Sequence, residues 1–154
     1  MEREKIYIGN DHAGFDLKIH LMDFLISEGY EVEDVGTYDT NSCDYPDYAA
    51  VLCRKVIEDN AKGILVCSTG QGMSRSANKY DIEKIIAEVC WNEATARHAK
   101  EHSNANVLCI GQAEVTPELA EKMVSIWLKT PYIPEERHER RYQKTIGIQK
   151  LKSK

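Results

Sequence analysis

Short apolar runs alternate along this chain with longer segments of helical periodicity, and this alternation constrains the fold most. Strands are expected at residues 6–8, 30–35, 63–66, 85–90 and 107–110. The runs are nearly continuous in apolar residues, as in parallel strands that are covered by helices on both faces. The pattern predicts an α/β domain, namely a three-layer αβα Rossmann-like fold with a five-stranded parallel sheet.

Helical spacing and end signals fill the intervals between these runs. Gly29 is placed to end the first helix, and Thr116-Pro117-Glu118 offers a cap, a proline and an early acid to start a later one. After Pro131 and Pro134 a basic helix is expected from about residue 137 onward. We expect this C-terminal helix to pack on a partner subunit. The remaining helices are expected at about residues 17–25, 45–56, 73–79, 92–102 and 117–127.

Size, charge and cysteine content exclude several classes of protein. A chain of 154 residues suits a single domain, here residues 1–154, and a net charge of -5 argues against nucleic acid as a partner. No apolar run approaches the roughly 20 residues that span a membrane. The N-terminal residues lack a signal-peptide core, and the five cysteines form no Cys-x-x-Cys pair. A reduced, cytoplasmic setting is therefore expected.

The loop after the third strand carries the strongest chemical signal. It reads Cys67-Ser68-Thr69-Gly70-Gln71-Gly72-Met73 and leads into a helix. The turn and the helix N-terminus present unpaired amides that stabilise an oxyanion and favour a thiolate. Arg75 stands where a dinucleotide fingerprint has its third glycine, and no Gly-Lys-Ser/Thr or Cys-x5-Arg follows. The loop is thus not a nucleotide site; the alternative is a tight turn with an inert buried cysteine.

Four other polar segments are candidates for the same chemistry. Asp11-His12 follows the first strand, and carboxyl ends of parallel strands share one edge, so these residues are expected to meet Cys67 in one crevice. Arg137 and Arg141 lie one helical turn apart and suit a phosphate. Each segment also has a structural interpretation: Asp11 as a helix cap, His12 as a loop histidine, the arginines as a solvated tail, and residues 44–46 and 101–106 as a helix entry and a turn.

Taken together and in this order, the segments resemble the type B ribose-5-phosphate isomerase family. That family also includes galactose-6-phosphate and allose-6-phosphate isomerases, and the resemblance runs from about residue 5 to residue 148. The segments that carry it are Asp11-His12-Ala13-Gly14-Phe15, Asp44-Tyr45-Pro46, the loop from Cys67 to Ser74, Ala77-Asn78-Lys79, Glu101-His102, Asn106-Val107-Leu108 and Arg137-His138-x-x-Arg141.

The resemblance implies a single sugar-phosphate isomerase domain that acts in carbohydrate metabolism, in the pentose phosphate pathway. It implies a homodimer or tetramer whose active sites are shared between subunits, with no metal and no organic cofactor. The implied reaction interconverts ribose 5-phosphate and ribulose 5-phosphate through a cis-enediolate. Such a reaction needs a base, stabilisation of the enediolate oxygen and an anchor for the phosphate.

The resemblance also assigns roles to individual residues. Cys67 is implied as the base, with Thr69 beside it, and His102 of the neighbouring subunit as the group that opens the sugar ring. The amides of Ser68, Gly70, Gln71 and Gly72 are implied to hold the enediolate oxygens. Asp11, Asp44 and Tyr45 are implied to bind the sugar hydroxyls or relay protons among them, which counts Asp11 and Asp44 with the catalytic residues. Ser103 is implied to bind substrate, and contacts with the phosphate are implied for His12, Arg137 and Arg141.

The chain departs from the pattern of this family at several binding positions. Ser103 stands in place of an asparagine, and Ala113 in place of a phosphate-binding arginine; the other changes are Ser68, Gln71 and Arg75. Because the catalytic set is kept while the binding set is changed, two alternatives stay open. One is isomerisation of another phosphosugar, such as galactose 6-phosphate, allose 6-phosphate or a tetrose phosphate. The other is a non-catalytic relative that binds sugar phosphates.

Overall fold

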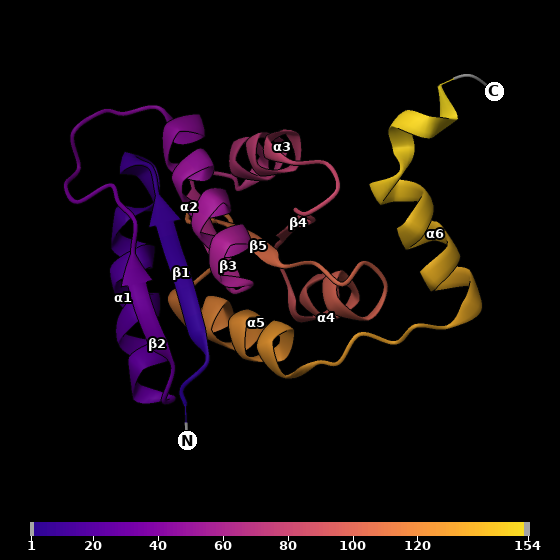
Figure 1. Cartoon of the computed structure of the whole chain (residues 1–154). Helices are drawn as coiled ribbons and strands as arrows, with labels where there is room; N and C mark the ends of the chain where they lie inside the picture. Colours follow the sequence, from indigo (N-terminus) through magenta and orange to yellow (C-terminus); the bar gives the residue numbers. More distant parts are fainter. Residues whose placement is uncertain (1, 153–154) are drawn as a thin grey trace.

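A computed structural model describes residues 2–152 and contains one parallel sheet (Figure 1). The strand order is β2-β1-β3-β5-β4. The five-stranded parallel sheet predicted from the apolar runs is confirmed, and every predicted strand end lies within two residues of the observed one. The strands are β1 (Lys5–Asn10), β2 (Glu31–Asp34), β3 (Lys62–Cys67), β4 (Ala87–Cys90) and β5 (Val107–Gly111).

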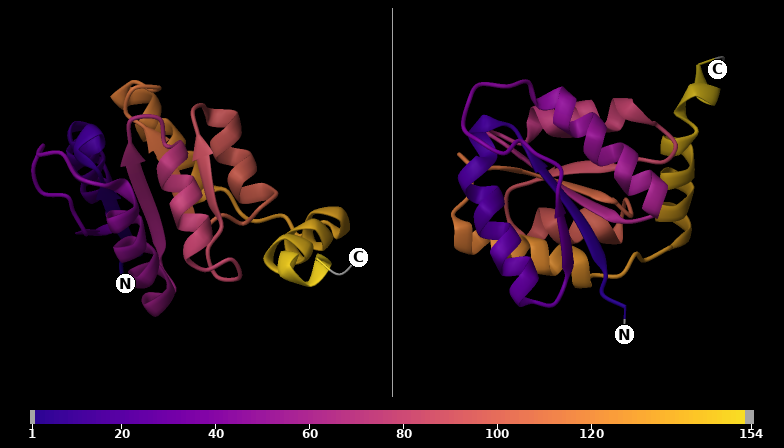
Figure 2. Two further views of the ribbon diagram at one scale, coloured as in Figure 1. Left: turned by 90° about the horizontal axis from the view of Figure 1, so that it is seen from above. Right: turned by 60° about the vertical axis from the view of Figure 1, so that its left-hand side comes forward.

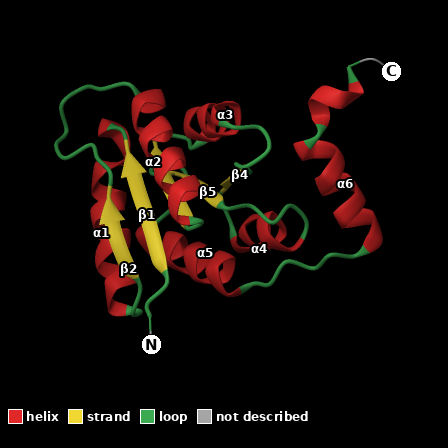
Figure 3. Ribbon diagram, in the orientation of Figure 1, coloured by secondary structure: helices red, strands yellow, loops and turns green. Residues whose placement is uncertain are grey.

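Helices cover both faces of this sheet, which confirms the three-layer arrangement (Figures 2 and 3). On one face lie α1 (Phe15–Ser27), α4 (Glu93–Glu101) and α5 (Pro117–Lys129). On the other lie α2 (Tyr45–Asp59) and α3 (Gln71–Tyr80). The chain also forms a short 3₁₀ turn, η1 (His12–Gly14), a last helix, α6 (Glu136–Ile146), and a final turn, η2 (Ile148–Leu151).

Alternation along the strands divides the core into two apolar layers. Ile64 and Val66 of β3 face the side of α1 and α5, whereas Leu65 and Cys67 face the side of α2 and α3. All four side chains are buried, as expected for a central strand that is covered on both faces. Cys67 is the last residue of β3, so its side chain stands at the carboxyl edge of the sheet on the α2–α3 side.

The last helix stands apart from the sheet and its covering helices, at the end of the extended segment 130–135 (Figures 1 and 2). The Ile133 N–H donates to the Glu101 carbonyl at 3.3 Å, which ties this segment to the end of α4. All of α6 lies within residues 2–152, and it contains no buried residue. Its predicted position after the prolines is confirmed, while its packing on a partner subunit stays a prediction.

Within residues 2–152, none of the helices combines the length and the apolar content that crossing a membrane requires.

The cap of α5 gives a direct test of the local sequence signals. The Thr116 hydroxyl accepts a hydrogen bond from the Leu119 N–H at 3.1 Å. Thr116→Ala should therefore lower the free energy of unfolding by about 1 kcal/mol in a urea titration at fixed protein concentration. Thr116→Ser keeps the oxygen and should stay close to the wild type. Equal losses in the two variants would contradict the role of the cap.

Candidate active site

The carboxyl ends of the neighbouring strands β1 and β3 form the first part of the candidate site. These neighbouring strands pair with Asn10 opposite Val66. The next residue, Asp11, donates its backbone N–H to the Val66 carbonyl at 3.2 Å. The chain leaves β1 and β3 toward opposite faces of the sheet, through α1 and α3, so this is a switch point where ligands bind in such folds. Asp11 and Cys67 therefore follow or end neighbouring strands at one edge of the sheet, as predicted, while their meeting in one crevice stays a prediction.

Cys67 differs from the other buried cysteines in its surroundings. Its side chain is 4% exposed, and its Sγ accepts a hydrogen bond from the Gly70 N–H at 3.2 Å. An amide donor at this distance stabilises a thiolate. Burial raises the pKa of the Cys53 and Cys90 thiols to about 12 and that of Cys109 well above its ordinary value, so these three are inert.

The loop after β3 is held in a shape that only glycine permits at position 70. Gly70 has a φ of 81°, and a Cβ there would come within 2.8 Å of a Val89 methyl group. The loop is backed by the end of β5, because the Gln112 and Ala113 amides donate to the Cys67 and Ser68 carbonyls at 2.8 and 3.0 Å. This backing fixes the Gly70 amide against the sulfur.

The remaining loop residues lie at the N-terminus of α3. Thr69 is exposed, and its hydroxyl accepts from the Gln71 N–H at 3.4 Å. Ser68 and Gln71 are also exposed, whereas Gly72 is buried. The helix starts at Gln71, two residues before the predicted start, because the left-handed Gly70 turns the chain directly into it. The first amides of a helix have no partner within it, so they are available to an anion.

Asp11 caps the turn η1, as the structural interpretation of this residue as a helix cap predicted. Its carboxylate accepts from the Ala13 and Gly14 N–H groups at 3.0 and 3.2 Å, and its side chain is buried. His12 beside it is exposed, and its Nδ1 accepts from the Cys43 N–H at 3.2 Å. That bond leaves the other ring nitrogen of His12 free to carry the proton and donate it.

The start of α2 closes over the start of α3. Asp44 is the exposed N-cap residue of α2, and Tyr45 follows it. The Tyr45 ring lies so close to Gly72 that a Cβ there would meet Cζ at 2.7 Å. Arg75 Nη2 donates to the Tyr45 hydroxyl at 3.2 Å. Arg75 had been recognised only as a departure from the family pattern, and this contact makes it part of the site's wall.

A second group of predicted residues lies at the end of α4 and on α6. His102 is the C-cap residue of α4, and Ser103 follows it. Arg137 and Arg141 both project from α6 toward a cavity of about 460 Å³ that His102 and Ser103 also line. These four residues, called the α4–α6 group below, are therefore brought together, which confirms the predicted pairing of the two arginines on one helical face.

The structure adds His98 and Glu88, which sequence reasoning missed, to this group, and it adds His138, which was quoted in a motif but given no role. The His102 ring lies between His98 and His138, with ring centroids 4.8 and 4.3 Å away, and Glu88 also lines the cavity. Burial and the neighbouring His138 and His98 rings lower the pKa of the His102 imidazole. Of the two residues that were missed, only His98 had a sequence signal, namely its position one helical turn before His102.

The two groups occupy opposite edges of the sheet. Cys67 pairs with Gly111 at the carboxyl end of β5, whereas His102 precedes Val107, where β5 begins. The rise of β5 alone separates these edges by about 13 Å. The strand-end group, defined as Asp11, His12, Asp44, Tyr45 and residues 67–72, is thus not joined to the α4–α6 group within one chain.

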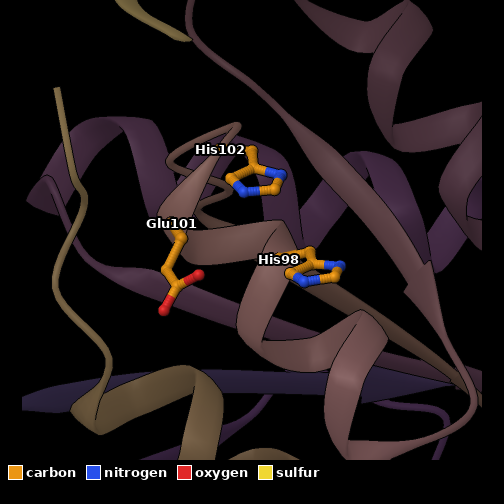
Figure 4. A group of neighbouring side chains, drawn as sticks. All are labelled: His98, Glu101 and His102. Carbon is orange, nitrogen blue, oxygen red and sulfur yellow. The ribbon is translucent and has the colours of Figure 1, made fainter. Parts of the chain in front are cut away.

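One set of side chains could hold a metal ion. Ligand atoms of His98, Glu101 and His102 lie within 4.8 Å of one another, and Figure 4 shows the three on the last turn of α4. The strand-end group differs from this set, because it combines backbone amides, which donate hydrogen bonds, with a thiol and two carboxylates.

Comparison with known proteins identifies the family of this chain. The family model described as Ribose/Galactose Isomerase matches residues 6–145. The ribose-5-phosphate isomerase B of Escherichia coli is 36% identical over 97% of this chain and 99% of its own. The galactose-6-phosphate isomerase subunit LacB of Clostridium acetobutylicum is 38% identical over 84% of this chain and 74% of its own.

A solved structure shows the same fold. The ribose 5-phosphate isomerase of Thermotoga maritima superposes with a TM-score of 0.90 at 42% identity, over 95% of this chain and 99% of that one. A shared fold, a family model that spans nearly the whole chain and relatives of this similarity lead to one conclusion: the chain belongs to the ribose/galactose isomerase family of aldose–ketose isomerases.

Proposed function

We propose that this protein interconverts ribose 5-phosphate and ribulose 5-phosphate in the cytoplasm, as part of pentose phosphate metabolism. The observation that carries the proposal is the Cys67 sulfur, which lies at a strand end beside Asp11 and accepts the Gly70 amide. The relative from Escherichia coli bears the name of this activity, and so does the Thermotoga maritima structure.

The thiolate of Cys67 acts as the base in this proposal. It removes the proton from C2 of the open-chain aldose and returns it to C1, so one group serves both steps. The proton of the C2 hydroxyl passes to the C1 oxygen, so that C1 becomes an alcohol and C2 the carbonyl carbon. The negative charge that develops on the enediolate oxygens is stabilised by those amides of residues 68–72 that are not already bonded within the loop, where Gly70 donates to the Cys67 sulfur and Gln71 to the Thr69 hydroxyl. Thr69 lies next to this position on an exposed turn, where its hydroxyl can contact the substrate. Asp11, Asp44, Tyr45 and Ser103 contact the sugar hydroxyls.

We propose that a second subunit completes the site, in a homodimer or a higher assembly of dimers. The separation of the strand-end group from the α4–α6 group supports this, because neither group alone has both a base and a ring-opening residue. The exposure of α6 supports it too, since a helix of 11 residues needs packing to be stable. His12 of one subunit and Arg137 and Arg141 of the other then bind the phosphate.

His102 opens the furanose ring in this scheme. Its lowered pKa keeps the imidazole neutral at neutral pH, and a neutral imidazole accepts the proton of the anomeric hydroxyl. The proton then passes to the ring oxygen as the ring bond breaks. A neutral His102 also avoids adding a third charge next to Arg137 and Arg141 in the shared cavity.

Galactose 6-phosphate is the second candidate substrate. The similarity to the subunit LacB favours it, and Ala113 leaves the phosphate site without an arginine that the resemblance would predict there. Arg75 brings a positive charge to the strand-end group in which that arginine is missing. Its Nη2 donates to the Tyr45 hydroxyl at 3.2 Å. We propose that Arg75 shapes the pocket for the sugar, while the partner's α6 carries the phosphate.

The role of Cys67 is tested with a panel of ribose 5-phosphate, galactose 6-phosphate, allose 6-phosphate and a tetrose phosphate. Wild-type protein should give the highest kcat/KM on ribose 5-phosphate. Cys67→Ala should lower kcat by roughly 10² to 10⁴-fold with little change in substrate affinity, because only the base is lost. Cys90→Ala is the matched control, since that thiol is buried and inert, and should leave kcat near the wild-type value.

Two results of this panel would contradict the proposal. If kcat/KM is higher on galactose 6-phosphate than on ribose 5-phosphate, the proposed substrate is wrong, although the reaction is still an aldose–ketose isomerisation. Binding of the sugar phosphates without turnover, unchanged by Cys67→Ala, would show a non-catalytic binding protein.

The shared site is tested by mixing two inactive variants. Cys67→Ala and His102→Ala each damage both sites of their own dimer. After the subunits exchange, a mixed dimer has one site with both changes and one intact site, so equal mixing should restore about a quarter of the wild-type activity. Activity should be measured before and after exchange. No recovery, with exchange verified by mass spectrometry, would show that Cys67 and His102 do not act across subunits.

The lowered pKa of His102 predicts the pH dependence of ring opening. Protonation removes the acceptor, so kcat/KM on cyclic substrate should fall as the pH drops below about 6.5, the ordinary pKa of histidine. His138→Asn removes one neighbour that lowers this pKa and should move the inflection to higher pH. The titration of His102 by NMR gives the same value independently. An inflection that does not move in the variant would contradict the role of the His138 ring.

A further inference from the structure

We propose that His98, Glu101 and His102 form a site for a divalent transition-metal ion, zinc above all, and that the bound ion inhibits the isomerase. The site is regulatory and is separate from the chemistry at Cys67. The inhibition rests on the proposed ring-opening role of His102, whereas the binding of the ion does not.

The backbone of α4 sets the two histidines in register. The His102 N–H donates to the His98 carbonyl at 3.0 Å, so the helical spacing continues through the cap residue. Residues four apart on a helix lie on one face. The two imidazoles are nearly parallel, with an interplanar angle of 10° and centroids 4.8 Å apart (Figure 4). Glu101 comes from the same turn of the helix.

The distances suit a metal after small side-chain rotations. The three ligand atoms lie within 4.8 Å of one another. Two ligand atoms of a tetrahedral zinc ion lie about 3.4 Å apart, because each is about 2.1 Å from the metal. His98 and His102 are exposed and Glu101 is partly exposed, so their side chains have room to turn inward.

A cavity receives the ion and its water molecules. His98 and His102 both line a hollow of about 380 Å³ that Glu88 also lines. Three protein ligands leave a position for water, and a second carboxylate nearby offers a hydrogen-bond acceptor to that water. The hollow is thus large enough for a hydrated ion beside His98 and His102, whereas Glu101 does not line it and would reach the ion from the side.

The ligand set selects the metal. Two neutral imidazoles and one carboxylate suit Zn²⁺, Cu²⁺, Ni²⁺ and Co²⁺, whereas Mg²⁺ and Ca²⁺ prefer oxygen alone. The order His-x-x-Glu-His, here residues 98–102, also occurs in a class of zinc peptidases. In this chain α4 ends at Glu101, so we infer the binding of a metal and no peptidase chemistry.

Occupation of this site removes the function proposed for His102. A nitrogen that binds a metal has no lone pair for a proton, so the imidazole no longer accepts one from the sugar. The ion also adds positive charge beside Arg137 and His138 at the ring of His102. Zinc should therefore act on the cyclic substrate first, before any effect on the chemistry at Cys67.

Binding is measured on the full, metal-stripped chain with Zn²⁺ by calorimetry and with Co²⁺ by its visible absorption. We expect about one ion per chain and a spectrum typical of nitrogen and oxygen ligands. His98→Gln and, separately, Glu101→Gln should weaken binding about tenfold or more. His20→Gln is the matched control, because His20 also lies beside a carboxylate, with Nε2 3.7 Å from Glu121, but on another helix. Cys67→Ala should keep the ion.

Two results would overturn the site. One is unchanged binding in His98→Gln and Glu101→Gln, provided that circular dichroism shows both variants folded. The other is loss of the ion in Cys67→Ala, which would move the metal to the thiol.

Inhibition is measured in the same proteins. Glu101 is a ligand of the proposed ion but not a member of the α4–α6 group, so Glu101→Gln should keep the basal kcat/KM on ribose 5-phosphate at neutral pH and lose the inhibition by zinc. Zinc that binds without inhibiting would support the metal site and would overturn the ring-opening role of His102. Full activity with no bound ion would overturn the metal site and leave the isomerase as proposed.

Discussion

The bond from the Asp11 N–H to the Val66 carbonyl joins the two strands on which the site depends. It extends the parallel pairing of β1 and β3 one step beyond the sheet. As a result, the buried carboxylate of Asp11 and the sulfur of Cys67 leave adjacent strands at one level. The loop after β3 is then determined by local geometry. The Gly70 amide points back to the Cys67 sulfur, and α3 starts at the next residue, Gln71.

Much of this could be predicted from the sequence, since the relevant signals are local. Apolar runs gave the five strands, and the rule that ligands bind at carboxyl ends placed Asp11 next to Cys67. The contact between Tyr45 and Arg75 could not be predicted, because it depends on how α2 and α3 cross. The same holds for the tilted contact between the His138 and His102 rings, which depends on the path of an extended segment that has no periodicity.

The chain keeps its thiols and imidazoles in different electrostatic settings. Cys53, Cys90 and Cys109 lie where burial raises the pKa and makes them structural, while Cys67 has an amide donor at the sulfur. His102 lies at the end of α4, where burial and the His138 and His98 rings lower the pKa of its imidazole. The proposed base and the proposed ring-opening group thus lie in different surroundings, at opposite ends of β5.

The detached position of α6 has a consequence for how such a protein behaves in dilute solution. Although α6 contains no buried residue, three contacts hold it within one molecule: the Ile133 bond to Glu101, the His138 ring beside His102 and the Tyr132 hydroxyl that donates to Glu139. The two apolar layers on the sheet, by contrast, are formed without α6. Dilution would then dismantle a two-chain site while leaving the fold intact, so specific activity would vary with protein concentration although circular dichroism would not.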